Sequence, residues 1–175
     1  MITQARLKER LNYNPDTGVF TWKRREELRP TDITWNKRFA DKRAGNINKA
    51  SGYVMMYVDG VNYHAHRLAC VYMTGEAPAV TDHVDLDRAN NKWTNLRAAT
   101  HSQNLQNQRV KSNSSNGAKG VYLNKGRLHQ AKPWSAQISV SGSRLRLGYF
   151  ETKEQAAQAY WAAAQKYFGQ FARAA

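Results

Sequence analysis

Three short polar motifs in the middle of the chain contain residues that could hydrolyse a phosphodiester bond. They are Asp82-His83, Asn95-Leu96-Arg97 and Asn104, with 12 residues from His83 to Asn95 and 9 from Asn95 to Asn104. Hydrolysis needs a base that takes a proton from water, and His is the side chain best suited to this near neutral pH. A divalent cation can offset the charge that builds on the phosphate, and Asp and Asn oxygens are suitable ligands for a hard cation.

Two elements have to bring these motifs together. Asp82 and His83 lie at the end of a predicted strand over 79–84, where neighbouring side chains point to opposite faces, so a twist or bulge is expected there. A turn-rich loop over 85–91 follows. A predicted helix over 100–108 could return Asn104 to the same point.

Charge indicates a polyanionic partner, either nucleic acid or an anionic membrane surface. Lys and Arg total 27 against 13 Asp and Glu, which gives a net charge of +14 and a pI near 10.1. Residues 88–150 contain eleven Lys or Arg and no Asp or Glu. Such a stretch is typical of phosphate contacts, the alternative being a basic surface kept for solubility.

Several classes of protein are not expected. The chain has no apolar run of about 18 residues, so no membrane-spanning segment is expected, and its first residues do not resemble a secretory signal. Cys70 is the only cysteine, which excludes an intrachain disulfide and a Cys-based zinc site. A cytoplasmic setting is expected, with Cys70 filling space in the core.

The first hundred residues predict alternating short helices and strands. A helix is expected over 2–12, a turn over 14–18 and a strand over 19–22, followed by an irregular charged stretch over 23–44 in which Pro30 acts as a breaker. Strands over 52–58 and 61–64 flank a tight Asp59-Gly60 turn, and a helix over 65–73 ends near Gly75 and Pro78.

The C-terminal part predicts a small sheet followed by a helix. Residues 111–119 are rich in Ser, Asn and Gly and read as a linker. Strands are expected over 120–123, 134–140 and 144–150. Thr152 and Gln155 match a capping box at the start of the following helix.

The central motifs resemble the phage and intron-encoded HNH homing endonucleases over roughly residues 12–110. The residues that carry the resemblance are His66-Arg67-Leu68, Thr74-Gly75-Glu76-Ala77-Pro78, Asp82-His83, Asn91, Asn95-Leu96-Arg97, Thr100, Gln103-Asn104 and Asn107. The resemblance implies a ββα-metal fold in which His83 is the general base and Asp82 and Asn104 are the ligands of one divalent ion. It also implies that Asn95 holds the two strands of the motif together and helps to orient His83.

The chain departs from the commonest form of this family. Asn104 stands where many members have His, which places the chain in the H-N-N subset. An amide oxygen favours a hard ion, so Mg²⁺ is expected, with Mn²⁺ as an alternative. Asp85 and Asp87 are interpreted as loop carboxylates. His66 is interpreted as part of the structural motif His66-Arg67-Leu68, the alternative being a metal pair with His64.

Residues 117–173 resemble the ethylene-response-factor (apetala-two) type of DNA-binding domain. The resemblance is carried by Gly120-Val121-Tyr122, Trp134-Ser135-Ala136-Gln137-Ile138, the run from Leu147 to Thr152, the run from Glu154 to Tyr160, and Phe168-Gly169. It implies a three-stranded antiparallel sheet backed by one helix, with the sheet in the DNA major groove.

Alternation in Arg144-Leu145-Arg146-Leu147 puts both Arg on one face, towards DNA, and both Leu on the other, towards the helix. An ordinary solvated edge is the alternative for the two Arg, and core packing is the alternative for Trp134. The candidate DNA-contact residues are Arg97, Arg109, Lys111, Lys119, Arg127, Trp134, Gln137, Arg144 and Arg146.

Together these features predict an α+β chain with an HNH ββα-metal domain over 1–110, including an N-terminal β-hairpin extension. The linker over 111–119 and a DNA-binding domain over 120–175 would follow. The expected function is site-specific, metal-dependent cleavage of double-stranded DNA by a phage or mobile-element enzyme. One active site per chain and no dimerisation heptad favour a monomeric nickase. The alternatives are a DNA-binding regulator with a degenerate nuclease motif, and an RNA-binding or packaging accessory protein.

Overall fold

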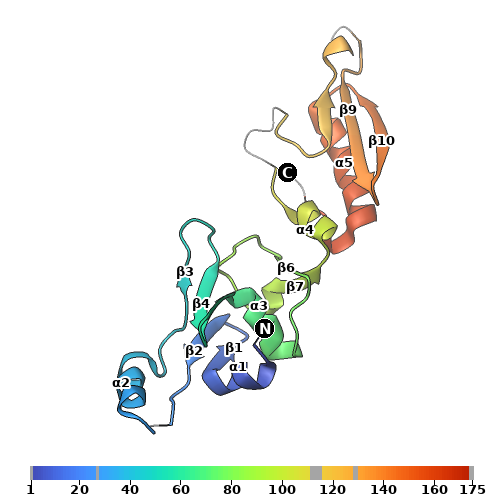
Figure 1. Ribbon diagram of the computed structural model, residues 1–175. Coiled ribbons are helices and arrows are strands. Elements are labelled where there is room, and N and C mark those ends of the chain that lie inside the picture. The colour runs from blue at the N-terminus through green and yellow to red at the C-terminus, as the bar shows by residue number, and fades with distance from the viewer. Residues whose placement is uncertain (1, 27, 111–115, 128–129, 174–175) are drawn as a thin grey trace. The chain divides into compact units, whose positions relative to one another are not determined.

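The computed structural model describes residues 2–26, 28–110, 116–127 and 130–173. The chain divides into two compact units, Met1–Thr100 and His101–Ala175, drawn from blue to green and from yellow to red in Figure 1. Within the described ranges, no helix is both long and apolar enough to cross a membrane.

A short helix and a hairpin begin the first unit. They are α1 (Gln4–Arg10), β1 (Leu11–Asn14) and β2 (Val19–Trp22). The helix ends before the predicted residue 12, because Leu11 takes extended backbone angles and pairs with Trp22. In the turn, the Asn14 side-chain oxygen accepts hydrogen bonds from two following backbone N–H groups, each at 3.0 Å.

The stretch over 23–44 contains a helix, α2 (Pro30–Phe39), so the prediction of an irregular segment was wrong. Pro30 is the first residue of this helix, where its missing N–H removes no helical hydrogen bond. Asp32, in the first turn, accepts from the Arg29 side chain at 3.0 and 3.1 Å and lies at the positive end of the helix dipole.

A small antiparallel sheet and a third helix follow. They are β3 (Asn46–Ile47), β4 (Val54–Val58), β5 (Val61–His64) and α3 (Ala65–Thr74). Asp59 and Gly60 both have positive φ, 48° and 83°, and form the predicted tight turn between β4 and β5. α3 ends, as predicted, at Gly75, which adopts the left-handed conformation.

A second hairpin carries the central motif. It consists of β6 (Val80–His83), a short 3₁₀ turn η1 (Trp93–Asn95) and β7 (Leu96–Ala99). β6 and β7 pair in continuous antiparallel register, with Asp82 opposite Arg97 and His83 opposite Leu96. The bulge predicted at this point is absent. Asp82 and His83 are nevertheless both buried, because each side of the strand end is covered by other side chains.

The core of the first unit joins all of its parts. Leu7 and Leu11 from α1 and β1 pack with Phe20 from β2, Met56 from β4 and Leu68 from α3, and each is at most 2% exposed. Removal of this apolar surface from water is the main stabilising contribution to the unit. The site is therefore built on a scaffold in which the N-terminal hairpin and the β6–β7 hairpin share one core.

The second unit begins with a short helix and continues as a sheet with one long helix packed on it (Figure 1). Its elements are α4 (His101–Asn107), β8 (Val121–Leu123), η2 (Lys125–Arg127), β9 (Trp134–Val140), β10 (Ser143–Phe150), α5 (Lys153–Phe168) and η3 (Gly169–Phe171). The three strands are antiparallel in the order β10-β9-β8. α5 starts at the predicted capping box of Thr152 and Gln155, and it buries Ala156, Ala163 and Ala164.

Small residues permit the close contact between α5 and the sheet. A Cβ on Gly120 would lie 2.3 Å from the Gln137 carbonyl oxygen and 2.3 Å from the ring of Tyr160. Gly120 also has a φ of 63°. A side chain at this position would therefore push β9 and α5 away from the turn that begins β8.

The border between the units lies at Thr100–His101, before the expected domain end at residue 110. α4 belongs to the second unit, where its Gln106 carbonyl oxygen accepts a hydrogen bond from Lys119 Nζ at 2.7 Å. Of the predicted linker over 111–119, residues 111–115 lie outside the described residues. The rest is packed, since Ala118 is 8% exposed and the Asn116 side chain donates to the backbone.

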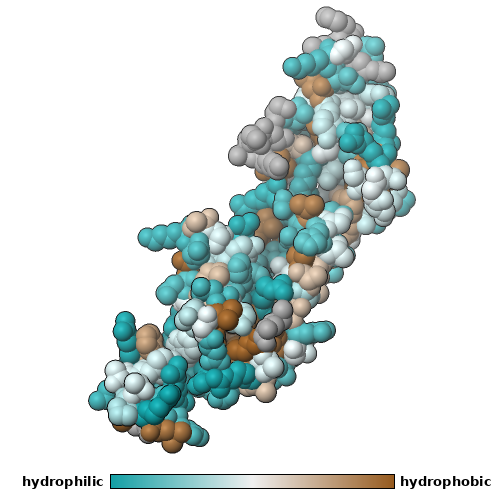
Figure 2. Space-filling view, in the orientation of Figure 1, coloured by the Kyte–Doolittle hydropathy of each residue, from teal (hydrophilic) through white to brown (hydrophobic). Residues whose placement is uncertain are grey.

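The two units differ in charge. The second contains 11 Lys and Arg against 2 Asp and Glu, a net charge of 11 − 2 = +9 from the sequence total of +14. Figure 2 shows a face that is mostly hydrophilic, with hydrophobic residues in small separate groups. Most of the excess positive charge therefore lies in the second unit, which carries the β10-β9-β8 sheet.

Candidate active site

His83 is the predicted catalytic residue, and it ends β6 with a side chain only 5% exposed. Its Nε2 lies 3.2 Å from the Oδ1 atom of Asn91, which is 2% exposed. The Asn91 Nδ2 group donates to the carbonyl oxygen of Ala89 at 3.1 Å, and this fixes which end of the amide faces His83. The amide therefore presents an acceptor to the imidazole.

This arrangement favours one tautomer of His83. Because Asn91 Oδ1 can only accept, the proton of the neutral imidazole lies on Nε2. The other nitrogen, Nδ1, then carries the lone pair. A neutral imidazole held in one tautomer has the form that a general base needs.

Burial favours the neutral form of His83. Desolvation lowers the pKa of this imidazole, while the hydrogen bond with Asn91 and the charge of Asp85 act in the opposite direction. The ring lies 5.1 Å from the ring of His66 and 6.0 Å from that of Tyr53, measured between centroids. His83 is thus enclosed by aromatic rings on one side and held by an amide on the other.

His66, at the start of α3, is an unusual member of this cluster. It is 6% exposed, and its Nδ1 has no hydrogen-bond partner among the described residues. Desolvation, followed by the charges of His83 and His64, lowers its pKa to about 3. Its ring lies edge-on to that of His83, so a His66 side chain whose neutral form is favoured encloses His83 on this side, as a structural residue would.

Asp82 faces the other side of the hairpin and pairs with its cross-strand partner, Arg97. The Asp82 Oδ2 atom accepts from Arg97 Nε at 2.8 Å and lies 2.7 Å from Arg97 NH2. The two side chains are 2% and 13% exposed, so the pair is removed from solvent. Arg97 was predicted to contact DNA, and this contact stays a prediction; in this structure its guanidinium binds Asp82.

Asn95 holds the loop between β6 and β7 in shape. Its Nδ2 donates to Asp85 Oδ1 at 2.9 Å and to the Asn90 carbonyl oxygen at 2.8 Å, while its Oδ1 accepts from the Asp85 backbone N–H at 3.0 Å. Its own carbonyl oxygen accepts from the Val84 backbone N–H. Because Asn90 precedes Asn91, these bonds fix the segment that presents the acceptor to His83.

The N-terminal hairpin braces the same loop from outside. The Tyr13 hydroxyl donates to the Asn91 carbonyl oxygen at 2.7 Å, and the Trp93 backbone N–H donates to the Pro15 carbonyl oxygen at 2.9 Å. A Cβ on Gly18 would lie 2.3 Å from the carbonyl carbon of Asn91. The hairpin therefore packs directly against the peptide that carries the His83 partner.

Asn104, the second predicted metal ligand, lies on α4 and so belongs to the second unit, whereas Asp82 lies in the first. It is half-buried. Among the residues described, no group of three or more His, Cys, Asp or Glu side chains is placed to hold a metal ion. The oxygen donors of Asp82 and Asn104 nevertheless fit a hard divalent ion chemically.

The predicted DNA-contact residues of the sheet fall on two faces. Arg144 lies opposite Ser139, and Arg146 opposite Gln137, so these side chains share the face away from α5. Both Arg are exposed. On the other face, Leu147 packs into the core while Leu145 stays 38% exposed, so only one of the two Leu is covered by the helix.

Other candidates have different surroundings. Trp134 packs against Ala136 and Ala156, so core packing is the interpretation that the structure favours. Lys119 is bound to the carbonyl oxygen of Gln106, and burial lowers its pKa. Arg109 is exposed, the side chain of Arg127 is outside the described part of the chain, and so is Lys111.

Two residues of the site had no assigned role at the sequence level. Asn91 was noted only as part of a resemblance, and Tyr13 not at all, because both act through partners that are remote or lie across a loop. The one sequence signal was the density of Asn residues over 90–95, which a turn explains equally well.

Comparison with known proteins agrees with this geometry. A family model described as HNH endonuclease matches residues 63–106, which include all of β6, η1 and β7. Residues 63–106 are therefore similar to the HNH endonuclease family, and this similarity supports the predicted class of enzyme, a nuclease. The match ends at residue 106, so the resemblance of residues 117–173 to an ethylene-response-factor domain stays a prediction.

One curated protein and one solved structure are similar to this chain. A protein of Acanthamoeba polyphaga mimivirus, described as the uncharacterised HNH endonuclease L560, is 36% identical over 125 residues. The alignment covers 70% of this chain and 62% of the relative, so the chain spans less than two thirds of that protein. A solved structure of the HNH homing endonuclease I-HmuI has a TM-score of 0.41 at 20% identity and covers 91% of this chain and 85% of its own.

Proposed function

We propose that this protein is a site-specific, divalent-metal-dependent endonuclease that hydrolyses phosphodiester bonds in double-stranded DNA. The observation that carries the proposal is the state of His83. Burial favours its neutral form, its contact with Asn91 favours the tautomer with the proton on Nε2, and it lies within the segment that matches the HNH family. Those are the properties of a base that removes a proton from water.

Each neighbouring residue has a defined part in this proposal. Asn91 holds the Nε2 proton, so that a proton taken up at Nδ1 gives an imidazolium whose other N–H already has an acceptor. Asn95 keeps the 85–91 loop in the shape that places Asn91. His66 and Tyr53 limit the access of bulk water to one side of the ring.

Asp82 and Asn104 are the proposed ligands of one divalent ion, Mg²⁺ in the first instance and Mn²⁺ as the alternative. When bound, such an ion supplies a positive charge that stabilises the leaving oxygen and the phosphate. In its absence Arg97 neutralises Asp82. We infer that Arg97 turns from Asp82 to a DNA phosphate when DNA and the ion are present, because a guanidinium binds either anion in a similar way.

The second unit is the proposed DNA-reading module. We propose that its sheet enters the major groove as in ethylene-response-factor domains, with Arg144, Arg146 and Gln137 on the contacting face. The support is the exposed position of both Arg on the side of the sheet away from α5 and the net charge of +9 in this unit. We further propose that the protein acts as a monomer and nicks one strand. It would be encoded by a phage or mobile element and act in the cytoplasm of the host cell.

The test is a plasmid-nicking assay with Mg²⁺, wild type and His83→Ala. Loss of the base is expected to lower the rate by about 10²- to 10⁴-fold while DNA affinity stays within about twofold. Exposed Asn12→Ala, on β1, is the control for substitution in the same unit. If His83→Ala cuts as fast as wild type, the assignment of the base is wrong. If wild type binds DNA but never cuts it under Mg²⁺ or Mn²⁺, the protein is a DNA-binding regulator instead.

A further inference from the structure

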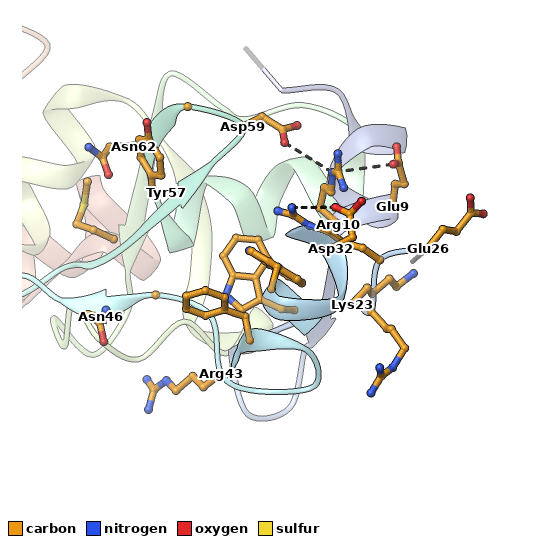
Figure 3. Close-up of a pocket in the computed structure, with 18 of the residues that line it drawn as sticks. Glu9, Arg10, Lys23, Glu26, Asp32, Arg43, Asn46, Tyr57, Asp59 and Asn62 are labelled. Atoms are coloured by element: carbon orange, nitrogen blue, oxygen red, sulfur yellow. Dashed lines mark ion pairs between the residues drawn. The ribbon is translucent and has the colours of Figure 1, made fainter. Parts of the chain in front are cut away.

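A concave surface lies in the first unit, away from the motif over 82–97. Its described lining residues all come from the range Glu9 to Asn62. It is a cleft of about 1370 Å³ between the α2 region and the β3–β4–β5 sheet. Figure 3 shows Glu9, Arg10 and Asp59 together at one end of it, with Arg43 and Asn46 at the other end of the view.

Two carboxylates of the cleft are already neutralised. Asp59 accepts from Arg6 at 2.6 Å, and Asp32 accepts from Arg29 at 3.0 Å. These contacts keep the pKa of both carboxyl groups below the usual range, so both stay charged and paired at neutral pH. Arg10 and Arg25 lie near the same two carboxylates, with Arg10 Nε 3.6 Å from Asp59 and Arg25 NH1 3.8 Å from Asp32. The described lining as a whole contains six Lys or Arg and four Asp or Glu, so cations remain in excess.

Hydrogen-bond donors remain without acceptors here. The Nε atoms of Arg10 and Arg25 are buried and have no hydrogen-bond partner among the described residues. Lys23 and Arg43 also line the cleft, and neither forms an ion pair with a described carboxylate. Buried guanidinium N–H groups are normally satisfied. The two unsatisfied Nε atoms, together with the partly exposed Lys23 and the exposed Arg43, therefore indicate that an anion binds in this cleft.

Flat aromatic surfaces lie among these cations. The Arg25 guanidinium is 3.8 Å from the ring centre of Trp35, and that ring meets Trp22 edge-on at 5.5 Å. A guanidinium held flat on an indole is oriented so that its edge can donate to phosphate oxygens. Interleaved Arg and aromatic side chains are typical of surfaces that follow a nucleic-acid backbone.

We propose that this cleft is a second DNA-contact site, which binds the sugar–phosphate backbone of the duplex beside the segment that is cut. The proposal rests on the proposed endonuclease function. It assigns Lys23 and Arg43 to phosphates, with the side chains of Arg10 and Arg25, which also line the cleft, adding positive charge beside them. DNA would then be held at two places, by this cleft and by the sheet of the second unit.

The test compares Lys23→Ala/Arg43→Ala with the matched control Lys37→Ala/Lys49→Ala, in the full chain. The control also removes two positive charges from exposed positions of the first unit, but neither Lys37 nor Lys49 lines the cleft. DNA affinity is measured at several salt concentrations, on an intact duplex that contains the site that wild type cuts. Ethylation interference then maps which phosphates each protein needs.

The cleft variant is expected to bind about tenfold more weakly at 0.15 M salt, and its plot of log affinity against log salt should be shallower by about 2. Interference at a few phosphates on one side of the cut should disappear in this variant and persist in the control. Cleavage at saturating DNA should stay within about twofold of wild type.

Three results would overturn the proposal. They are equal affinity and salt dependence in the two double variants, an unchanged interference pattern, and a selective loss of cleavage without loss of binding. A wild type that binds DNA without cutting it would refute the endonuclease function, while the binding and interference comparison would still decide the role of the cleft.

Discussion

Asn91 and His83 show how one amide can set the chemistry of an imidazole. The Asn91 Nδ2–H to Ala89 bond fixes the amide, the amide fixes the Nε2 proton, and this leaves the lone pair on Nδ1. The site thus needs an uncharged acceptor at position 91. A charged acceptor would stabilise the imidazolium, raise the pKa of His83 and so lower the fraction of neutral base at a given pH.

The Asn91→Asp variant tests the influence of Asn91 on His83 through the pH dependence of cleavage. A carboxylate in place of the amide oxygen should raise the pKa of His83, so the acid limb of the kcat/KM profile should move to higher pH by about 1 unit. Asn91→Leu should lower kcat about tenfold or more, because the tautomer is no longer fixed. Asn12→Asp adds the same charge at an exposed site of the unit, and its profile should match wild type. An unshifted profile in Asn91→Asp would show that Asn91 does not act through His83.

His66 makes a prediction about stability. Its pKa is lowered to about 3 in the folded protein, whereas an unfolded His titrates near 6.5. Between these values the unfolded chain binds more protons, so the stabilising effect of a neutral His66 is complete above pH 6.5 and is lost as pH falls towards 3. The slope is about 1.4 kcal/mol per pH unit for one such group.

Urea unfolding between pH 7 and pH 5 measures this slope before most carboxylates titrate. Wild type should lose stability over this range, and His66→Phe, which keeps a ring in the aromatic cluster, should lose about 1 kcal/mol less per pH unit below 6.5. His64 and His83 also have lowered pKa values and account for a remaining slope. Equal slopes for both proteins would mean that His66 is protonated in the folded state.

Among the elements, the N-terminal hairpin is the least expected part of the active site. It supplies Tyr13 and the close contact of Gly18 to the loop that carries Asn91. Gly18 and Gly75 form a matched pair for testing this. Both have positive φ, 71° and 92°, but a Cβ at Gly75 would have nothing within 4 Å.

Gly75→Ala should cost about 1 kcal/mol, since only the backbone conformation resists it. Gly18→Ala should cost clearly more, about 2–4 kcal/mol, because its Cβ must also displace the Asn91 peptide. It should reduce kcat as well, and Gly75→Ala should not. Urea titrations and single-turnover cleavage give the two values, and similar costs for both variants would argue against a bracing role.

The elements also show what the sequence could predict. Strong local signals, such as the Asp59-Gly60 turn and the capping box at Thr152, predicted their elements correctly. α2 was missed because Pro30 fits the first turn of a helix as well as it fits a break. The motif residues could be selected by type and spacing. Their partners could not, because Tyr13 and Asn91 are 78 residues apart and meet only through the fold.

For the whole molecule, the division into two units implies that cutting and reading can be separated by mutation. The proposed base, His83, lies in the first unit, and the exposed Arg144 and Arg146 lie in the second. Lys153→Ala/Lys166→Ala on α5 removes the same charge as Arg144→Ala/Arg146→Ala without touching the open face of the sheet. Any difference in DNA binding or cleavage between these double variants then results from the position of the removed charges and not from the change in net charge.

Arg144→Ala/Arg146→Ala should lose preference for its target by about 10- to 100-fold, since each well-placed Arg contact to a base discriminates by about 1–3 kcal/mol. Its cleavage of non-target DNA at low salt should remain near wild type, because the base and its partners are intact. His83→Ala should show the reverse, with binding preference kept and cleavage lost. Cleavage of a library with one randomised target region, compared across these proteins, measures both properties. If the Arg variant kept its preference, the sheet would only hold phosphates, and sequence readout would have to come from the first unit.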